Sequence, residues 1–177
     1  MAKAPPLLGF SAYGSGIGKT TLLTKLIPEL VAQGIRVSVI KHAHHSFDID
    51  HPGKDSYRLR EAGAIQTLVA SGERWALMTE LKHLENHMES EPVLAKLVRQ
   101  IDPTLVDVIL VEGFKDAPIS KIEVHRPSLN MPILANRDAH IIAIASDESI
   151  QTSLPLLDLN NISEIAAFIR QWLAKQS

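Results

Sequence analysis

The stretch that decides the fold is Gly14-Ser15-Gly16-Ile17-Gly18-Lys19-Thr20-Thr21, near the amino terminus. Its glycines can adopt positive φ angles and turn backbone N–H groups toward an anion, and a helix that follows adds a partial positive charge. In such a loop Lys19 contacts the β- and γ-phosphates of a nucleotide, and the Thr20 hydroxyl holds Mg²⁺. We therefore predict that residues 14–21 bind a nucleotide.

The loop departs from the usual pattern in one place. The spacing G-x-x-x-x-G-K-[ST] would require glycine at position 13, where the chain has Tyr13, so that Gly14 lies one residue late. The alternative interpretation is a glycine-rich turn between a strand and a helix with a chance Gly-Lys-Thr. A strand before the loop and a helix after it favour the nucleotide site.

Both flanks of the loop have the expected pattern. Residues 7–13 are typical of a buried strand, and residues 20–33 form an apolar-periodic helix that Gly34 ends. Residues 35–40 alternate and are β-branched, which indicates a second strand. The helix between them is long enough for a parallel crossover, so the chain begins with a βαβ unit.

The rest of the chain continues this α/β pattern. Residues 106–111 are an almost continuous apolar run, as in a central parallel strand covered on both faces. Further strands are predicted at 121–125 and 141–145, a hairpin at 64–70 with 75–79, and helices at 55–62, toward Ile101 and after Asn161, whose reciprocal capping partner would be Glu164. The predicted fold is a single P-loop NTPase-like domain over residues 1–177: a mostly parallel sheet with helices on both faces and a β-hairpin extension.

Composition excludes several classes of protein. With 177 residues, 45% of them apolar and 21% charged, the chain can build a core, so a disordered or fibrous protein is excluded. The formal net charge of −2 provides no broad basic field for nucleic acid or an anionic membrane surface. The absence of cysteine excludes disulfides and thiolate metal sites and is consistent with the cytoplasm, the predicted location.

Carboxylates form the second group of candidate site residues. Glu112 ends the apolar strand and precedes Gly113, at the edge where open parallel sheets bind ligands. A carboxylate there can hold Mg²⁺ or orient an attacking water, so we predict catalytic and metal-binding roles for Glu112. The alternative is a glutamate that faces solvent at the end of a strand.

The segment 42–51 concentrates four histidines with Asp48 and Asp50. Its position after the second strand predicts contact with the γ-phosphate and its ion, with Asp48 as a catalytic residue and Asp50 as a metal ligand. Imidazole and carboxylate also suit Zn²⁺ or Ni²⁺, although the spacing matches no closed tetrahedral site. A polar loop without either function is the third interpretation.

Selection of the base is assigned to Asp147. The chain lacks the Asn-Lys-x-Asp motif with which many proteins select guanine, but Asp147 follows the strand 141–145 at the ligand-binding edge. Its carboxylate could accept hydrogen bonds from guanine N1–H and the N2 amino group, which adenine does not offer as a pair. Alternatively, Asp147 caps the turn before Ile150.

Several motifs in a fixed order resemble the molybdopterin-guanine dinucleotide biosynthesis protein B (MobB) family. They are the phosphate loop, Ile40-Lys41-His42 with His44-His45, Asp48 and Asp50, Gly53-Lys54-Asp55-Ser56, Ala62-Gly63-Ala64, Arg74-Trp75-Ala76-Leu77 and Val111-Glu112-Gly113-Phe114-Lys115. The resemblance implies a homodimer that binds GTP with Mg²⁺. It also implies an adapter for the guanylyltransferase that joins GMP to molybdopterin, with at most slow GTP hydrolysis.

Two other functions and one interface follow from the residues. The histidine-rich segment would also suit a GTPase that inserts nickel or another metal, and a P-loop kinase would need a lid with several arginines, of which the sequence has only scattered ones. The alternation over residues 119–134, around Pro127 and Pro132, predicts a projecting strand or hairpin that pairs with a second copy of the chain. The alternative is an edge strand that these prolines keep from pairing.

Overall fold

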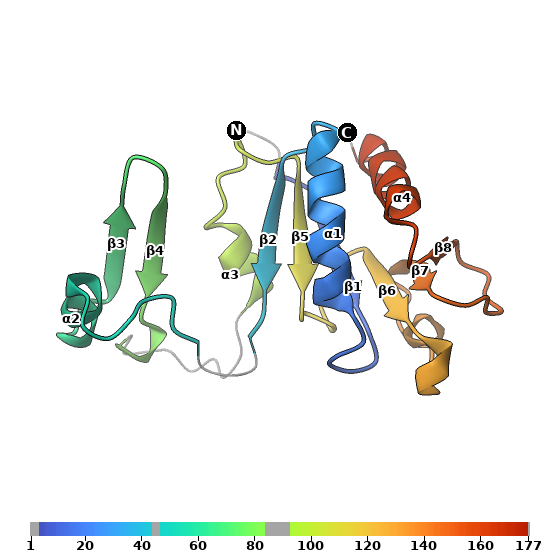
Figure 1. The fold of residues 1–177 in the computed structure, drawn as a ribbon, viewed down its shortest axis with the longest axis horizontal. Coiled ribbons are helices and arrows are strands. Elements are labelled where there is room, and N and C mark those ends of the chain that lie inside the picture. Colours follow the sequence, from blue (N-terminus) through green and yellow to red (C-terminus); the bar gives the residue numbers. More distant parts are fainter. Residues whose placement is uncertain (1–3, 44–46, 84–92, 177) are drawn as a thin grey trace. The chain divides into compact units, whose positions relative to one another are not determined.

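The computed structural model describes residues 4–43, 47–83 and 93–176. The chain forms two compact units, one made of Met1–His42 with Val93–Ser177 and the other of Ala43–Pro92 (Figure 1). Each unit is described by itself, and the single-domain prediction stays a prediction. Within the described residues, no helix has the length and apolar character needed to cross a membrane.

The first unit is built on a six-stranded sheet in the order β2-β5-β1-β6-β7-β8, in which every pair of neighbours is parallel. The helix α1 (Lys19–Ala32) connects β1 to β2, but β5 lies between these two strands. The predicted parallel sheet is therefore confirmed, with the first two strands separated by one position. The strands are β1 Leu7–Ser11, β2 Val37–Lys41, β5 Val108–Glu112, β6 Lys121–His125, β7 Ile141–Ser146 and β8 Leu156–Asp158.

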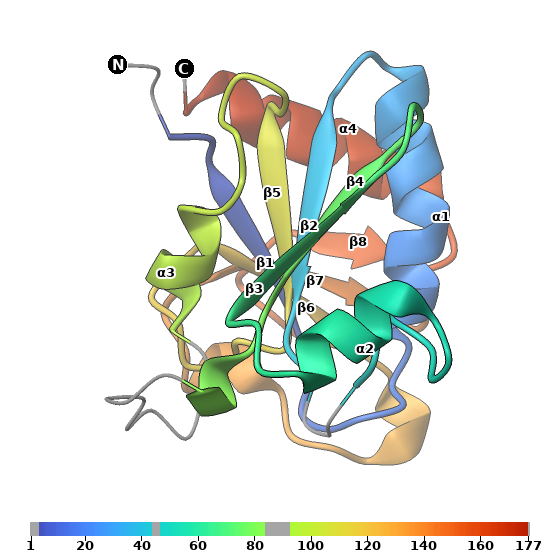
Figure 2. The same ribbon diagram turned by 90° about the vertical axis from the view of Figure 1, so that its left-hand side faces the viewer.

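Helices cover both faces of this sheet, as predicted. On one face α1 and α4 (Ile162–Ala174) share one core cluster with Val108 and Leu110 of β5 (Figure 2). On the other face α3 (Leu94–Val98) packs against Ile109 and Val111. Successive side chains of a strand point to opposite faces, so a strand covered on both faces must be apolar at every position.

The second unit contains α2 (Asp55–Glu61) and a two-stranded antiparallel sheet, β3 (Gln66–Ala70) and β4 (Trp75–Thr79). The register pairs Ala70 with Trp75, and a turn at residues 71–74 joins the strands. The Ser71 N–H donates to the Arg74 carbonyl at 2.8 Å. The predicted helix and hairpin are thus confirmed. A short 3₁₀ helix, Leu81–His83, follows the hairpin.

Three details differ from the prediction. The helix toward Ile101 is limited to α3, because the N–H groups of Gln100 and Ile101 donate to carbonyls three residues back, a tighter turn than an α-helix. The strand β8 was not predicted, since it has only three residues. Asn161 does cap α4 by accepting from the Glu164 N–H, but its own N–H donates to the Asp158 carbonyl, so the reciprocal contact with Glu164 is absent there.

The prediction that residues 119–134 project as an unpaired strand is wrong. The strand β6 lies inside the sheet between β1 and β7, and its five residues are buried. Its charged side chains are paired internally: Lys121 Nζ lies 2.6 Å from an Asp138 carboxylate oxygen, and Glu123 accepts from the N–H groups of Leu134 and Ala135. The alternating pattern therefore reflects internal ion pairs and helix capping, and it indicates no free edge.

Candidate nucleotide site

The phosphate loop connects β1 to the first turn of α1. Gly16 and Gly18 have φ angles of 76° and 116°, which a residue with a Cβ rarely adopts. Between them Ile17 is buried and joins the main core, which anchors the loop. Among the residues that the structure describes, no side-chain hydrogen bond caps the start of α1, so its first N–H groups can donate to an anion.

Lys19 is folded back over this loop. Its ammonium group donates to the Gly14 carbonyl, at the beginning of the glycine-rich segment, at 2.9 Å. Burial lowers the pKa of Lys19; the Glu112 charge opposes this effect and the Lys41 charge adds to it. The loop therefore already holds the cation that the sequence predicted for the phosphates. The roles of Gly14, Ser15, Gly16, Ile17, Gly18, Lys19, Thr20 and Thr21 in nucleotide binding stay predictions.

Thr20 and Glu112, the two predicted metal ligands of this edge, lie in contact. The Thr20 hydroxyl donates to Glu112 Oε1 at 2.7 Å, and the Glu112 residue is only 8% exposed. Lys41, at the end of β2, donates to Glu112 Oε2 at 3.1 Å and to Thr20 Oγ1 at 3.0 Å. One ammonium group thus contacts both oxygen-bearing side chains.

Sequence reasoning assigned Lys41 no role, although it appears in the motif that carried the family resemblance. The signal was present: Lys41 is the first charged residue after the strand predicted at 35–40, at the same edge as Glu112. The structure pairs Lys41 directly with Glu112 in the register of β2 and β5.

A close approach of two chain segments fixes this arrangement. Gly113 has a φ of 95°, and a Cβ on it would lie 2.9 Å from His42 Cβ. The His42 N–H donates to the Glu112 carbonyl at 2.9 Å, and the His42 ring lies 5.3 Å from the Phe114 ring. Glycine at position 113 therefore lets the ends of β2 and β5 approach each other, which holds Lys41 against Glu112.

Arg126 connects the loop to the predicted base-binding residue. Its Nε donates to the Ile17 carbonyl at 3.0 Å, and its Nη1 forms an ion pair with Asp147 Oδ2. Asp147 Oδ1 is buried and has no hydrogen-bond partner among the described residues. In the nearby turn the Glu148 N–H donates to Ser146 Oγ. Arg126 was also missed, although it directly follows the predicted strand 121–125.

Asp48 and Asp50 belong to the second unit. Asp48 Oδ1 accepts from Arg60 Nη2 at 2.7 Å, and Asp50 Oδ1 accepts from the His51 N–H at 2.9 Å. No group of three or more His, Asp or Glu side chains suited to a metal ion occurs in the described part of the chain. His44 and His45 lie outside the described residues, so the catalytic role of Asp48, the metal role of Asp50 and the transition-metal interpretation all stay predictions.

Comparison with known proteins identifies the family. A model described as "MobB: Molybdopterin guanine dinucleotide synthesis protein B" matches residues 7–147. The chain belongs to the MobB family. The predicted family is confirmed, and with it a role in molybdenum cofactor biosynthesis. MobB membership also supports nucleotide binding in general.

Relatives match the chain over nearly its whole length. A molybdopterin-guanine dinucleotide biosynthesis adapter protein from Haemophilus influenzae is 50% identical over 169 residues, which cover 95% of this chain and 89% of the relative. The protein of that name from Escherichia coli is 50% identical over 173 residues, or 97% of this chain and 95% of the relative.

Solved MobB structures share the fold. A crystal structure of molybdopterin-guanine biosynthesis protein B superimposes with a TM-score of 0.70 at 24% identity, covering 95% of this chain and 99% of that one. A MobB homologue from Bacillus stearothermophilus gives a TM-score of 0.67 at 21% identity, with 96% and 98% covered. At these identities the similarity concerns the fold alone.

Proposed function

We propose that this protein binds GTP with Mg²⁺ and serves as an adapter for the guanylyltransferase that attaches GMP to molybdopterin. Nucleotide binding is supported by the arrangement of Lys19, Thr20 and Glu112 at one end of the sheet. They lie beside the start of α1, where the N-cap residue Gly18 makes no side-chain hydrogen bond. The phosphates would accept from the loop N–H groups and from Lys19. Any GTP hydrolysis would be slow, as the family resemblance implies.

The side chains at this edge fit a divalent cation. Mg²⁺ prefers oxygen ligands, and Thr20 and Glu112 offer a hydroxyl and a carboxylate whose oxygens lie 2.7 Å apart. Lys41 Nζ lies within 3.1 Å of both side chains, so the pair already holds a positive charge. When bound, Mg²⁺ would neutralise phosphate charge. Lys41 would leave the pair, and its ammonium would then be available to the phosphates.

Guanine selection is proposed for Asp147. The salt bridge to Arg126 holds one carboxylate oxygen, and the other is buried without a partner among the described residues. A buried acceptor without a donor is costly, and guanine N1–H or the N2 amino group would supply one. Because Arg126 also holds the Ile17 carbonyl, it would link base binding to the shape of the phosphate loop.

The proposed homodimer is supported by the β3–β4 hairpin, because β6 lies inside the sheet and has no free edge. Leu68, Trp75 and Leu77 lie on one face of the β3–β4 hairpin and are 62%, 65% and 41% exposed. A two-stranded sheet is marginally stable alone, and a second copy of the same hairpin would cover this apolar face. Light scattering that shows a monomer at micromolar concentrations and above would contradict the dimer.

The nucleotide proposal is tested by Lys19→Ala. Removing the ammonium should lower GTP affinity at least about tenfold in calorimetry, because a charged hydrogen bond to phosphate is lost. The matched control is Lys25→Ala, an exposed lysine on the same helix, which should bind GTP like the unaltered protein. Unchanged GTP binding in Lys19→Ala would exclude this loop as the phosphate site.

Base selection needs its own test. Asp147→Asn should weaken GTP and favour xanthosine triphosphate, whose O2 can accept from the new amide; the expected change is roughly ten- to a hundredfold in relative affinity. A mutant that keeps the original preference for GTP over ATP and xanthosine triphosphate would show that guanine is selected elsewhere.

A further inference from the structure

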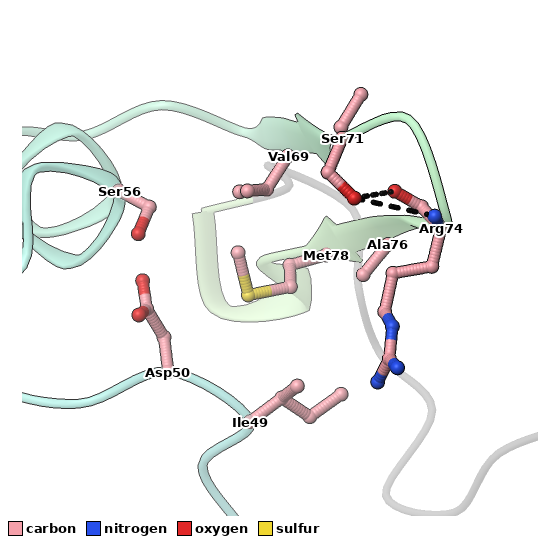
Figure 3. Close-up of a pocket in the computed structure, with 9 residues that line it drawn as sticks. Ile49, Asp50, Ser56, Val69, Ser71, Arg74, Ala76 and Met78 are labelled. Carbon is pink, nitrogen blue, oxygen red and sulfur yellow. Dashed lines mark hydrogen bonds between the residues drawn. The ribbon is translucent and has the colours of Figure 1, made fainter.

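The second unit contains a pocket that no role assigned so far explains. Its volume is about 250 Å³, and it lies between the segment that carries Asp50, the helix α2 and the inner face of the hairpin (Figure 3). That inner face carries Val69 and Met78, whereas the exposed Leu68, Trp75 and Leu77 lie on the opposite face. The pocket and the proposed dimer surface are therefore separate.

The Asp50 carboxylate at one end of the pocket has an oxygen that accepts no hydrogen bond from the described residues. Asp50 Oδ2 is buried and has no hydrogen-bond partner among the described residues, while Oδ1 accepts from the His51 N–H. Figure 3 shows the Asp50 carboxylate and the Ser56 hydroxyl pointing toward each other across the pocket. Because each carboxylate oxygen has two lone pairs, Asp50 could accept from two neighbouring N–H groups of a ligand.

The walls are apolar and partly uncovered. Ile49 is 63% exposed and Val69 is 43% exposed, although both line the pocket. Met78 presents its sulfur to the interior, as Figure 3 shows, and thioethers pack well against flat aromatic rings. A flat ring placed between these side chains would cover apolar surface that is now open to solvent.

Arg74 supplies a cation on the hairpin side of the pocket. Its backbone is fixed by the turn: Ser71 Oγ accepts from the Arg74 N–H at 3.3 Å, and the Ser71 N–H donates to the Arg74 carbonyl. A guanidinium group binds phosphate through paired N–H donors. The pocket thus combines a carboxylate, apolar walls and a guanidinium.

We propose that this pocket binds a 2-amino-4-oxo-pyrimidine ring system that carries a phosphate. Asp50 would accept from the ring N–H and the amino group, Met78 and Val69 would contact one face of the ring, and Arg74 would hold the phosphate. The choice of a pterin phosphate such as molybdopterin as the ligand rests on the proposed adapter function. A guanine nucleotide has the same recognition groups, so the experiment must separate the two.

The experiment uses the full chain free of nucleotide. Neopterin monophosphate is titrated by its own fluorescence into the unaltered protein and into Asp50→Asn, Arg74→Ala, Asp55→Asn and Arg58→Ala. The first two variants should bind the pterin at least about tenfold more weakly. Asp55 and Arg58 are the matched controls, because both are exposed residues of α2, and their variants should change the affinity less than about twofold.

Three further measurements distinguish the possible ligands. In the first, GMP is titrated into Lys19→Ala, in which the phosphate loop is weakened. If GMP binds this variant more tightly than neopterin monophosphate does, and if Asp50→Asn abolishes that binding, the pocket is a site for a guanine nucleotide. Val69→Trp, which fills the pocket, should block the ligand even if Asp50→Asn fails to fold. A divalent-cation chelator should leave pterin binding unchanged, and loss of binding in chelator would overturn the direct contact with Asp50.

Two variants distinguish the pocket from the phosphate loop. Lys19→Ala should lose GTP and keep neopterin monophosphate, whereas Arg74→Ala should lose the pterin and keep GTP. Absence of binding by both neopterin monophosphate and GMP, or equal affinities in all variants, would overturn the pocket assignment. If the unaltered protein binds neopterin monophosphate but does not bind GTP, only the proposed function is contradicted.

Discussion

The two units of this chain differ in how much of their own apolar surface they bury. In the first unit every residue of β5 and β6 is buried. In the second unit the hairpin leaves Leu68 and Trp75 more than 60% exposed, and Arg60 is the residue of α2 that is buried. A six-stranded sheet with helices on both faces encloses its strands, whereas two strands cannot cover their own faces.

This difference in burial suits the two units to different functions. The phosphate loop needs side chains held within a fraction of an ångström. The first unit places Lys19, Thr20 and Glu112 on a helix and a fully buried strand and joins them by hydrogen bonds. The second unit keeps apolar surface and a buried unpaired acceptor, Asp50 Oδ2, which suits a segment that is completed by a ligand or another chain.

The largest expected effect comes from the core of the first unit. Leu110→Ala removes a side chain that is 0% exposed in the main core, and it should lower the free energy of unfolding by about 2–5 kcal/mol. Urea denaturation of the full chain measures it. A loss below about 1 kcal/mol would show that the first unit is less tightly packed than the comparison requires.

A buried ion pair should come next. Asp138→Asn leaves the buried Lys121 ammonium without its carboxylate and should cost about 1–3 kcal/mol at neutral pH. Burial acts to raise the pKa of Asp138, but hydrogen bonds from Lys121 and His140 leave it below the usual value. The carboxylate therefore stabilises the fold above its unfolded pKa, and this contribution is lost as pH falls through the lower folded pKa.

The pH dependence provides the check. The stability difference between the unaltered protein and Asp138→Asn should be full at pH 7 and shrink below about pH 4, near the unfolded pKa of an aspartate. Thermal unfolding across that range measures it. A difference that stays constant down to about pH 3, well below that unfolded pKa, would indicate that the substitution disturbs packing instead of charge.

The second unit should respond locally. Arg60 donates to Asp48 at 2.7 Å and to Glu80 at 3.1 Å, which joins α2 to the segments on either side of it in sequence. Arg60→Met should speed amide hydrogen exchange several-fold in residues 55–80, with little change in β5 and β6. Equal acceleration in the central strands would show that the two units unfold as one.

The smallest effect is expected on the outer face of the hairpin. Leu68→Ala makes the same chemical change as Leu110→Ala but at a side chain that is 62% exposed, so the stability of the monomer should change by no more than about 0.5 kcal/mol. Urea denaturation at low protein concentration measures the free energy of unfolding of Leu68→Ala and of Leu110→Ala. A loss as large as that in Leu110→Ala would mean that the outer face is already covered within one chain.

The sequence by itself determined the main fold elements and the family. The glycine-rich loop, the apolar run before Glu112 and the hairpin at residues 66–79 depend on local glycine conformation and on side-chain periodicity, both of which are visible in a single sequence. The order of several motifs along the chain is itself enough to indicate the MobB family.

Only the tertiary structure decided how distant charges are paired. Lys41 contacts Glu112 because β2 and β5 are neighbours, and Arg126 reaches Ile17 and Asp147 because β6 lies between β1 and β7. The alternation over residues 119–134 predicts a projecting strand or hairpin, because a local pattern does not show that Lys121 is paired with Asp138 and that Glu123 accepts from the N–H groups of Leu134 and Ala135. Strand order in a sheet is set by packing of the whole unit, and local sequence patterns do not encode it.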